Sequence, residues 1–346
     1  SRGLGDVYKR QVTHLTHVRY LSGFSGSNGA MLVSKDRTAA IATDGRYTTQ
    51  IGEEVPDIEA TIERNVGVAM LSKAAEGHRV GFEADYVSVA QLEKLREACP
   101  EGVTLVPVSG VIEEIRLTKD NLELTRLTEA AELTVEALDG LLQAGQLRAG
   151  RTEREVAADL EYRMRVLGAE RVSFDTIVAS GPNSAKPHHG AGDRVIADGD
   201  LVTIDFGMHR LGFNSDMTRT FAIGQIGELE REIYEVTLAA QLAGVKAAVQ
   251  GAKLVDVDKA CRDVIAEAGY GEYFVHSTGH GVGLDVHEAP SAAKTGTGVL
   301  EEGMTLTIEP GIYIPGKAGV RIEDTLIITS AAPKVITECS KELTVL

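Results

Sequence analysis

The chain has 346 residues, of which 43% are hydrophobic and 25% charged, and its formal net charge is −16. This length predicts about two globular domains, and the acidic balance argues against nucleic acid or an anionic membrane as the main partner. No stretch approaches the roughly 18 apolar residues of a membrane span. The three cysteines are far apart and odd in number, which argues against a disulfide framework and favours a reducing cytoplasm as the location.

The first part of the chain, from about residue 12 to residue 115, alternates short β-like runs with helical stretches. Residues 30–33 and 39–43 are predicted to pair as strands, and residues 91–96 to form a helix that ends near Pro100. Residues 1–11 lack the apolar core of a signal peptide and do not resemble the start of this domain. We expect the natural N-terminus to be missing or replaced.

Residues 116–121 are the predicted junction, which gives one domain over 1–115 and a second over 116–346. Beyond it, four segments carry apolar residues at three- and four-residue spacing, which predicts amphipathic helices packed on a core. The second helix begins with a capping box at Thr152 and Glu155 and stops at Gly168. The expected inward faces are Leu124, Leu127, Ala131, Thr134, Leu138 and Leu141; Val156, Leu160, Met164 and Leu167; Leu238, Leu242, Val245 and Val249; and Val257, Cys261 and Val264.

Carboxylates stand at the ends of β-rich apolar runs in the second domain, where they would be costly unless paired or metal-bound. Together with one histidine in a glycine-rich stretch they form an oxygen-rich ligand set. That set suits Mn²⁺, Co²⁺ or Fe²⁺ better than a structural zinc site. The candidate metal ligands are Asp205, Asp216, His280, Glu309 and Glu323.

A weak internal repeat relates two parts of this domain. Residues 199–205 parallel residues 303–309, and each segment reads as a turn, a strand and then a carboxylate. A second carboxylate, Asp216 or Glu323, follows 11 or 14 residues later. The pattern predicts two related halves that each give two carboxylates to a shared cleft.

Six short segments, in this order and spacing, resemble the pita-bread metallopeptidases, the family of methionine aminopeptidase, aminopeptidase P and prolidase. They are residues 203–207, 215–220, 276–284, 285–288, 307–311 and 319–324. The resemblance implies an α/β (α+β) chain with a small creatinase-type N-terminal domain and a pita-bread catalytic domain with a pseudo-twofold repeat. It also implies a homodimer.

The same resemblance assigns roles. It implies that Asp205 holds one metal ion, that Asp216 and Glu323 bridge two ions, and that His280 and Glu309 complete the other. The two ions would activate a water to hydroxide, with Glu309 shuttling the proton to the leaving amine. His188 and His287 match histidines that donate hydrogen bonds in the transition state. His276 and Arg321 match residues on the leaving-group side of the pocket, and Tyr313 is a candidate pocket wall. The other histidines, His14, His17, His78, His189 and His209, are expected to have no catalytic role.

The activity implied is hydrolysis of the Xaa-Pro bond, at the N-terminus of short proline-containing peptides or in dipeptides. Proline's missing N–H and fixed ring require a dedicated site. Mn²⁺ is the favoured metal, with Co²⁺, Zn²⁺ or Fe²⁺ as alternatives. Aminopeptidase and dipeptidase stay open because both share the ligands. Two other interpretations are a creatinase-like C–N hydrolase and a catalytically inactive peptide-binding module, and the complete ligand set argues against both.

Overall fold

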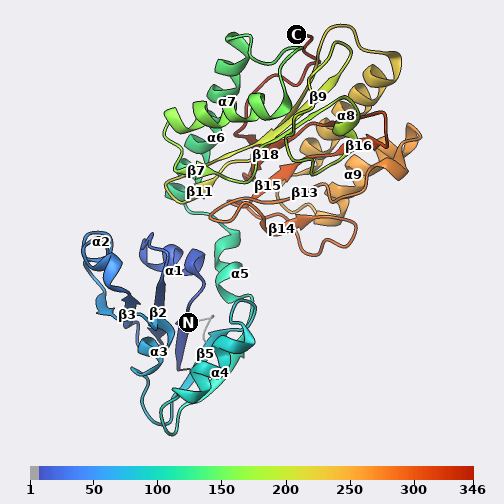
Figure 1. Ribbon diagram of the computed structural model, residues 1–346. Helices are drawn as coiled ribbons and strands as arrows, with labels where there is room; N and C mark the ends of the chain where they lie inside the picture. The colour runs from blue at the N-terminus through green and yellow to red at the C-terminus, as the bar shows by residue number, and fades with distance from the viewer. Residues whose placement is uncertain (1–7) are drawn as a thin grey trace. The chain divides into compact units, whose positions relative to one another are not determined.

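The computed structural model describes residues 8–346. The expectation that the natural N-terminus is missing or replaced concerns residues 1–11, of which residues 1–7 lie outside the described residues. Backbone contacts divide the chain into two compact units, with the boundary between Ile115 and Arg116. Within the described range, no helix is both long and apolar enough to cross a membrane. Each unit is an α/β structure, and Figure 1 shows the elements of both.

The first unit is built on one six-stranded sheet with the order β4-β3-β2-β1-β5-β6. Side chains of β2 alternate between two apolar clusters, one containing Met31 and the other containing Ala30 and Leu32. Helices therefore pack on both faces of this sheet. The elements are β1 (Lys9–Val12), α1 (Leu15–Ser22), β2 (Gly29–Ser34), β3 (Ala39–Thr43), α2 (Thr48–Glu54), β4 (Glu59–Ile62), α3 (Val66–Leu71), β5 (Arg79–Glu83), α4 (Val89–Glu97), β6 (Thr104–Val108) and α5 (Val111–Leu117).

The predicted strand pair and the predicted helix of this unit are confirmed as β2, β3 and α4. The sequence analysis begins the strands of this unit at about residue 12, which is too late, because Lys9–Val12 forms a strand between β2 and β5. Polar residues in this strand hid it from the hydrophobic pattern. Arg10 and Gln11 are 8% and 1% exposed, and the Gln11 side chain donates to the carbonyl of Gly67 at 2.6 Å.

The second unit contains two similar β-sheets, each with a pair of helices. In the first half, β8, β9 and β12 share an apolar cluster with α6 and α7. In the second half, β15, β18 and β19 share one with α8 and α9. Figure 1 shows the green pair α6 and α7 and the golden pair α8 and α9 on opposite sides of these strands. The α/β class with a creatinase-type domain and a pseudo-twofold pita-bread domain is thereby confirmed.

The remaining bounds define the second unit. They are α6 (Asn121–Gln143), α7 (Glu153–Val166), β7 (Arg171–Val172), β8 (Ile177–Ser180), β9 (Leu201–Phe206), β10 (Met208–Arg210), β11 (Phe213–Asn214), β12 (Met217–Ala222), α8 (Glu228–Ala247), α9 (Leu254–Glu267), β13 (Gly279–Gly281), β14 (Glu288–Ala292), β15 (Thr305–Ile308), β16 (Gly311–Ile314), β17 (Ala318–Arg321), β18 (Asp324–Ile327) and β19 (Lys334–Val335). Short 3₁₀ turns also occur among the described residues. In the first unit this is η1 (Gly45–Tyr47), and in the second unit they are η2 (Gly181–Ala185) and η3 (Gly271–Tyr273).

The predicted helices are all present, and the capping box at Thr152 is confirmed. The predicted inward face of α8 is only half right, since Leu238 and Val245 pack against the core but Leu242 is 49% exposed and Val249, just beyond the helix, is 40% exposed. Small and polar residues face the core instead. A methyl group on Gly244 would lie 2.3 Å from the sulfur of Cys261, so this helix packs too closely for leucine.

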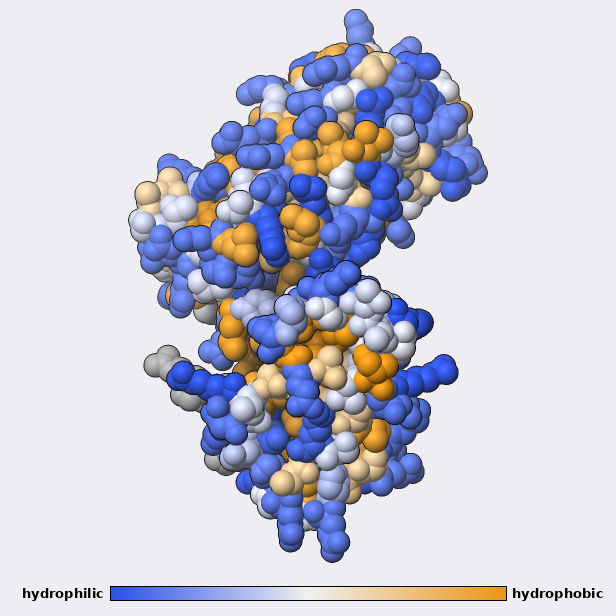
Figure 2. All heavy atoms as spheres, turned by 90° about the vertical axis from the view of Figure 1, so that its left-hand side faces the viewer, coloured by the Kyte–Doolittle hydropathy of each residue, from blue (hydrophilic) through white to orange (hydrophobic). Residues whose placement is uncertain are grey.

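Hydrophobic side chains on the face shown in Figure 2 form separate patches among hydrophilic ones. The largest exposures among apolar residues include Val89 at 78% and Tyr162 at 69%. Cys99, Cys261 and Cys339 are all free thiols, in agreement with the sequence.

Glu83 is the buried polar anchor of the first unit. It accepts hydrogen bonds from the Thr13 and His14 backbone at 2.6 and 2.8 Å and from His17 Nδ1 at 2.5 Å. Burial acts to raise the pKa of Glu83, but these hydrogen bonds outweigh it and the pKa is lowered. The charged form is therefore stabilised by folding. This contribution is complete above about pH 4.5 and is lost as the pH falls through the lower folded-state pKa.

We expect Glu83→Gln to weaken the first unit by about 1–3 kcal/mol at pH 7, because buried donors lose a charged acceptor. Amide hydrogen exchange of β1 and α1 measures the free energy of opening. The difference in this free energy between the variant and the wild type should shrink at acidic pH, where the wild-type carboxylate is also protonated. Glu97→Gln, on an exposed position of α4, is the control, and equal protection in both variants at pH 7 would contradict this role.

Candidate metal centre

The four candidate carboxylates stand at equivalent places in the two halves. In the first sheet Asp205 lies opposite Thr218, and Asp216 immediately precedes β12. In the second sheet Ile308 pairs with Asp324, so Glu309 and Glu323 flank the end of that pair. The two halves meet here, because Thr218 Oγ1 donates to Glu323 Oε2 at 2.6 Å and Glu323 N donates to the Thr218 carbonyl at 3.1 Å.

Three of these carboxylates crowd one point. Asp205, Asp216 and Glu323 each bring one oxygen within 4.8 Å of the others. Burial, and then repulsion from neighbouring carboxylates, raises the pKa of Asp216 and Glu323 well above the usual values. Oδ1 of Asp205 is buried and accepts no hydrogen bond from any described residue. An arrangement that concentrates negative charge and leaves an acceptor unused fits a divalent cation.

His280 is oriented as a metal ligand. Its Nδ1 lies 3.0 Å from the Gly281 carbonyl, so Nδ1 carries the proton that donates to it. Nε2 therefore faces Glu309 Oε1 at 3.2 Å and Asp216 Oδ2 at 3.7 Å. Burial acts to lower the pKa of His280, but Glu309 outweighs it and the pKa is raised. A cation at Nε2 would replace the proton that these carboxylates otherwise attract, and the backbone-fixed tautomer is typical of metal-binding histidines.

Glu309 completes the set. It accepts from Thr307 Oγ1 at 3.0 Å as well as facing His280. Burial would raise its pKa, but the hydrogen bond and charge of His280 lower the pKa of Glu309 to about 2. The carboxylate of Glu309 therefore stays ionised.

A cavity of about 500 Å³ opens onto these groups. It brings together most of the residues predicted from the sequence and adds an apolar wall that includes Phe174 and Ile177. Glu323 and Tyr313 stand behind its lining, where each is hydrogen-bonded to neighbouring site residues. The predicted residues that line the cavity are His188, Asp205, Asp216, His276, His280, His287, Glu309 and Arg321.

A hydrogen-bonded chain runs along one side of the cavity. Arg321 Nη2 donates to Asp205 Oδ2 at 2.6 Å, and Arg321 Nη1 donates to the Tyr313 hydroxyl at 2.8 Å. Tyr313 in turn lies 2.8 Å from His276 Nε2. His276 Nδ1 donates to the Ser277 carbonyl at 2.8 Å, so Nε2 accepts the Tyr313 proton. Burial lowers the pKa of His276, which favours this neutral form.

Comparison with known proteins places this geometry in a family. The model of metallopeptidase family M24 matches residues 125–330, and that of the creatinase/prolidase N-terminal domain matches residues 11–118. The chain belongs to metallopeptidase family M24.

The relatives of this chain include proteins named as peptidases. A Xaa-Pro dipeptidase of Pyrococcus furiosus is 46% identical over 334 residues, which is 94% of this chain and 92% of that protein. The structure of a Xaa-Pro dipeptidase from Bacillus anthracis is 41% identical with a TM-score of 0.93, covering 98% of this chain and 95% of the other. An X-Pro aminopeptidase from Thermotoga maritima is 34% identical with a TM-score of 0.90, covering 98% of each chain.

His287, on the rim of this M24 site, sits on a turn with a buried ionic support. Its ring centroid is 4.5 Å from that of His280, in an edge-on arrangement. The next residue, Glu288, pairs with Arg116 at 2.5 Å and Lys119 at 2.8 Å, and Arg116 also pairs with Asp285 at 2.8 Å. Both cations are nearly buried. The sequence analysis missed this support, because 169 and 172 residues separate Arg116 from its partners.

A second unpredicted contact holds the segment that carries His188. Glu153, fully buried at the start of α7, accepts from Ser180, from Asn183 and, at 2.7 Å, from His189 Nε2. His189, which was expected to have no catalytic role, thus lines the cavity and ties its wall to α7. The capping box at Thr152 located the helix start, but nothing in the pattern linked Glu153 to a histidine 36 residues away.

We expect Gly279→Ala to disrupt the centre, because the added methyl carbon would lie 1.7 Å from the Thr307 carbonyl oxygen. Relief of this overlap must move β13, and with it His280, at a cost of about 1–3 kcal/mol or more. The melting temperature of the protein and its affinity for Mn²⁺ should both fall. Gly52→Ala in α2, where an added methyl meets no atom within 4 Å, is the matched control. Normal Mn²⁺ affinity in Gly279→Ala would show that this close packing does not position His280.

Proposed function

We propose that this M24 chain is a metal-dependent exopeptidase that hydrolyses the Xaa-Pro bond at the N-terminus of peptides or in Xaa-Pro dipeptides. The observation that carries the proposal is the convergence of three carboxylates and His280 on one cavity, with the carboxylate of Glu323 next to two of them behind its lining. Relatives with full-length similarity are named Xaa-Pro dipeptidase or X-Pro aminopeptidase, which supports the same substrate class.

In this proposal Asp205, Asp216 and Glu323, together with His280 and Glu309, would hold two divalent ions. Mn²⁺ suits this oxygen-rich set best, with Co²⁺, Zn²⁺ or Fe²⁺ as alternatives. When bound, the ions would polarise the scissile carbonyl and lower the pKa of a water. Arg321 orients Asp205 through their 2.6 Å contact and partly offsets the burial that raises the pKa of this carboxyl.

The other residues handle protons and the substrate. Glu309, which faces His280 Nε2 at 3.2 Å beside the cavity, accepts a proton and passes it to the leaving amine nitrogen. His287 donates a hydrogen bond to the oxygen that becomes negative in the transition state, and His188 donates one near the leaving nitrogen. His276, Tyr313 and Arg321 form the wall on the leaving-group side.

Two other functions fit less well. A creatinase-like C–N hydrolase does not need the five metal ligands, and a catalytically inactive peptide-binding module should have lost some of them. All five residues are present and meet in space. The relatives carry peptidase names, which also disfavours both alternatives.

We further propose the organisation in which this activity operates. Residues 1–115 would form the creatinase-type domain and residues 116–346 the catalytic domain, and the division of the contacts at residue 115 supports this. The chain would act as a homodimer in the cytoplasm, a location that its three free thiols favour.

The deciding experiment offers the Mn²⁺-loaded protein an equimolar Xaa-Pro dipeptide and Xaa-Pro-Yaa tripeptide. We expect chelator-sensitive cleavage before proline. Asp216→Ala should lower turnover by about three orders of magnitude or more, since a bridging ligand is lost.

Cleavage of the dipeptide alone would identify a dipeptidase, and cleavage of the tripeptide an aminopeptidase. Failure of the metal-loaded protein to cleave either peptide would reject the proposed function. Near-normal turnover in metal-loaded Asp216→Ala would reject the assignment of that ligand.

His287→Ala should lower kcat by about 10²–10³-fold while KM changes little, because its hydrogen bond forms to charge that develops only in the transition state. Steady-state kinetics on the better peptide measures both constants. His78→Ala, in the first unit, is the control. An increase in KM with an unchanged kcat would make His287 a residue for binding the ground state.

A further inference from the structure

Behind the metal centre lies a second, fully buried polar cluster centred on Arg219. This arginine is on β12 and is 2% exposed. It directly follows Thr218, whose hydroxyl contacts the carboxylate of Glu323. Because side chains alternate along a strand, Thr218 faces Glu323 and Arg321 of the site and Arg219 faces the opposite side of the strand.

The guanidinium of Arg219 is satisfied almost entirely by backbone carbonyls. Its Nη1 donates to the carbonyls of Thr218, at 3.0 Å, and of Glu323. Its remaining donors reach the segment 337–340, with Nη2 to the carbonyls of Thr337 at 3.1 Å and Cys339 at 3.0 Å and Nε to that of Ser340 at 3.1 Å. One side chain therefore joins the strand of Asp216, the backbone of Glu323 and a late segment of the chain.

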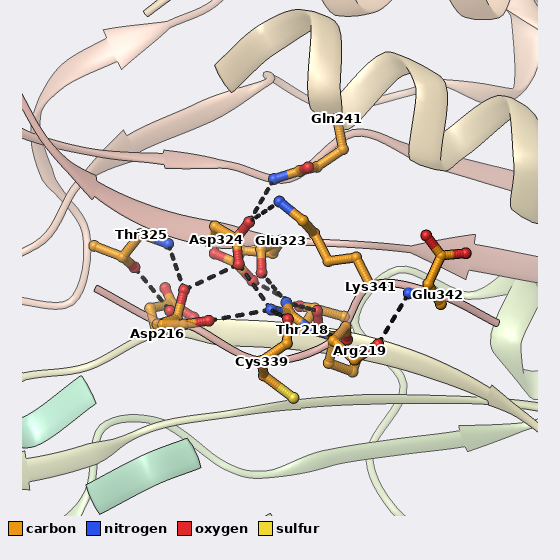
Figure 3. A network of polar contacts seen from close by, with 12 residues as sticks. Asp216, Thr218, Arg219, Gln241, Glu323, Asp324, Thr325, Cys339, Lys341 and Glu342 are labelled. Atoms are coloured by element: carbon orange, nitrogen blue, oxygen red, sulfur yellow. Dashed lines mark hydrogen bonds and ion pairs between the residues drawn. The ribbon is translucent and has the colours of Figure 1, made fainter. Parts of the chain in front are cut away.

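Asp324 is the counter-charge. It is fully buried and accepts from Arg219 at 2.8 Å, Gln241 at 2.9 Å, Lys341 at 2.6 Å and Thr337 at 3.2 Å. Burial would raise the pKa of Asp324, but the charges of Arg219 and Lys341 outweigh it and the pKa is lowered. Figure 3 shows Gln241 and Lys341 pointing at Asp324, with Arg219 close by on the neighbouring strand.

The cluster and its neighbours hold the backbone of two candidate ligands, Glu323 and Asp216, through hydrogen bonds. Asp324 follows Glu323 directly, so the two carboxylates lie on opposite faces of the same strand end. The carbonyl of Glu323 is held by Arg219, and the carbonyl of Asp216 accepts from Thr325 Oγ1 at 2.8 Å. The backbone N–H of Thr325 in turn donates a hydrogen bond to Thr337 Oγ1 at 3.1 Å. The positions of Asp216 and Glu323 thus share one buried network.

We propose that the Arg219–Asp324 pair, with Lys341, positions Glu323 and Asp216 for metal binding, so that residues 337–341 form a working part of the metal centre. This inference rests on the proposed metal centre. Carboxylates that repel one another drift apart unless their backbone is held, and the cluster supplies that hold from the side opposite the cavity. Arg219, Asp324 and Lys341 are positioning residues, since none of them lines the cavity.

The test measures Mn²⁺ affinity and stoichiometry of the full-length, metal-free protein by isothermal titration calorimetry. We expect Asp324→Asn, which keeps the shape of the side chain, to weaken Mn²⁺ binding by about 10–100-fold, as loss of outer support to metal ligands does elsewhere. Lys341→Met should weaken it in the same direction by a smaller factor. Asp263→Asn is the matched control, because Asp263 makes an exposed ion pair with Lys259 on α9.

A purely structural role predicts a different pattern, in which Asp324→Asn lowers the melting temperature while Mn²⁺ affinity stays within about twofold of wild type. That result would overturn the proposal. If Asp324→Asn does not fold, Lys341→Met decides, since Lys341 is partly exposed, and wild-type affinity in that variant would overturn it as well.

The experiment separates this inference from the proposed function. Mn²⁺ binding without Xaa-Pro cleavage would reject the activity and still allow the affinities to be compared. A wild-type protein that binds no Mn²⁺ would reject the metal centre and this inference together.

Discussion

Mutual repulsion among buried carboxylates is the constraint on which the catalytic unit depends. Asp205, Asp216 and Glu323 are brought within a few ångströms of one another, and burial, followed by the charge of neighbouring carboxylates, raises the pKa of each. A fold that holds them must supply rigidity from outside the site. Two strand ends, one from each half, provide it, and Thr218 locks the halves together at their meeting point.

The surrounding hydrogen bonds follow from the same constraint. Arg321 compensates one carboxylate and also donates to Tyr313, whose hydroxyl donates to neutral His276. His280 is fixed in a single tautomer by a backbone carbonyl, so that its free nitrogen faces the acidic groups. His276 and His280 thus each have the position of their ring proton set by a backbone carbonyl.

The structure brings together the five candidate ligands that sequence reasoning proposed, and each lies beside a local signal, a strand that ends in a carboxylate or glycines around a histidine. Sequence reasoning also found the paired strands, the helices and the repeat. It failed where packing overrides pattern. The face of α8 is lined by small and polar residues because Gly244 lies against Cys261, and β1 carries buried Arg10 and Gln11 where an apolar run was required. Long-range pairs such as Arg116 with Glu288 have no local signal at all.

The reach of Arg219 along the sequence bears on how the protein is made. Apart from the adjacent Thr218 carbonyl, its acceptors lie 104 to 121 residues later in the chain. During synthesis the first half therefore emerges with a guanidinium whose partners do not yet exist, and an unpaired arginine resists burial. The first sheet therefore reaches its final packing only together with residues 337–340. A chain cut before this segment would leave the guanidinium of Arg219 without most of its acceptors, so we expect the catalytic unit to fold as one piece and not half by half.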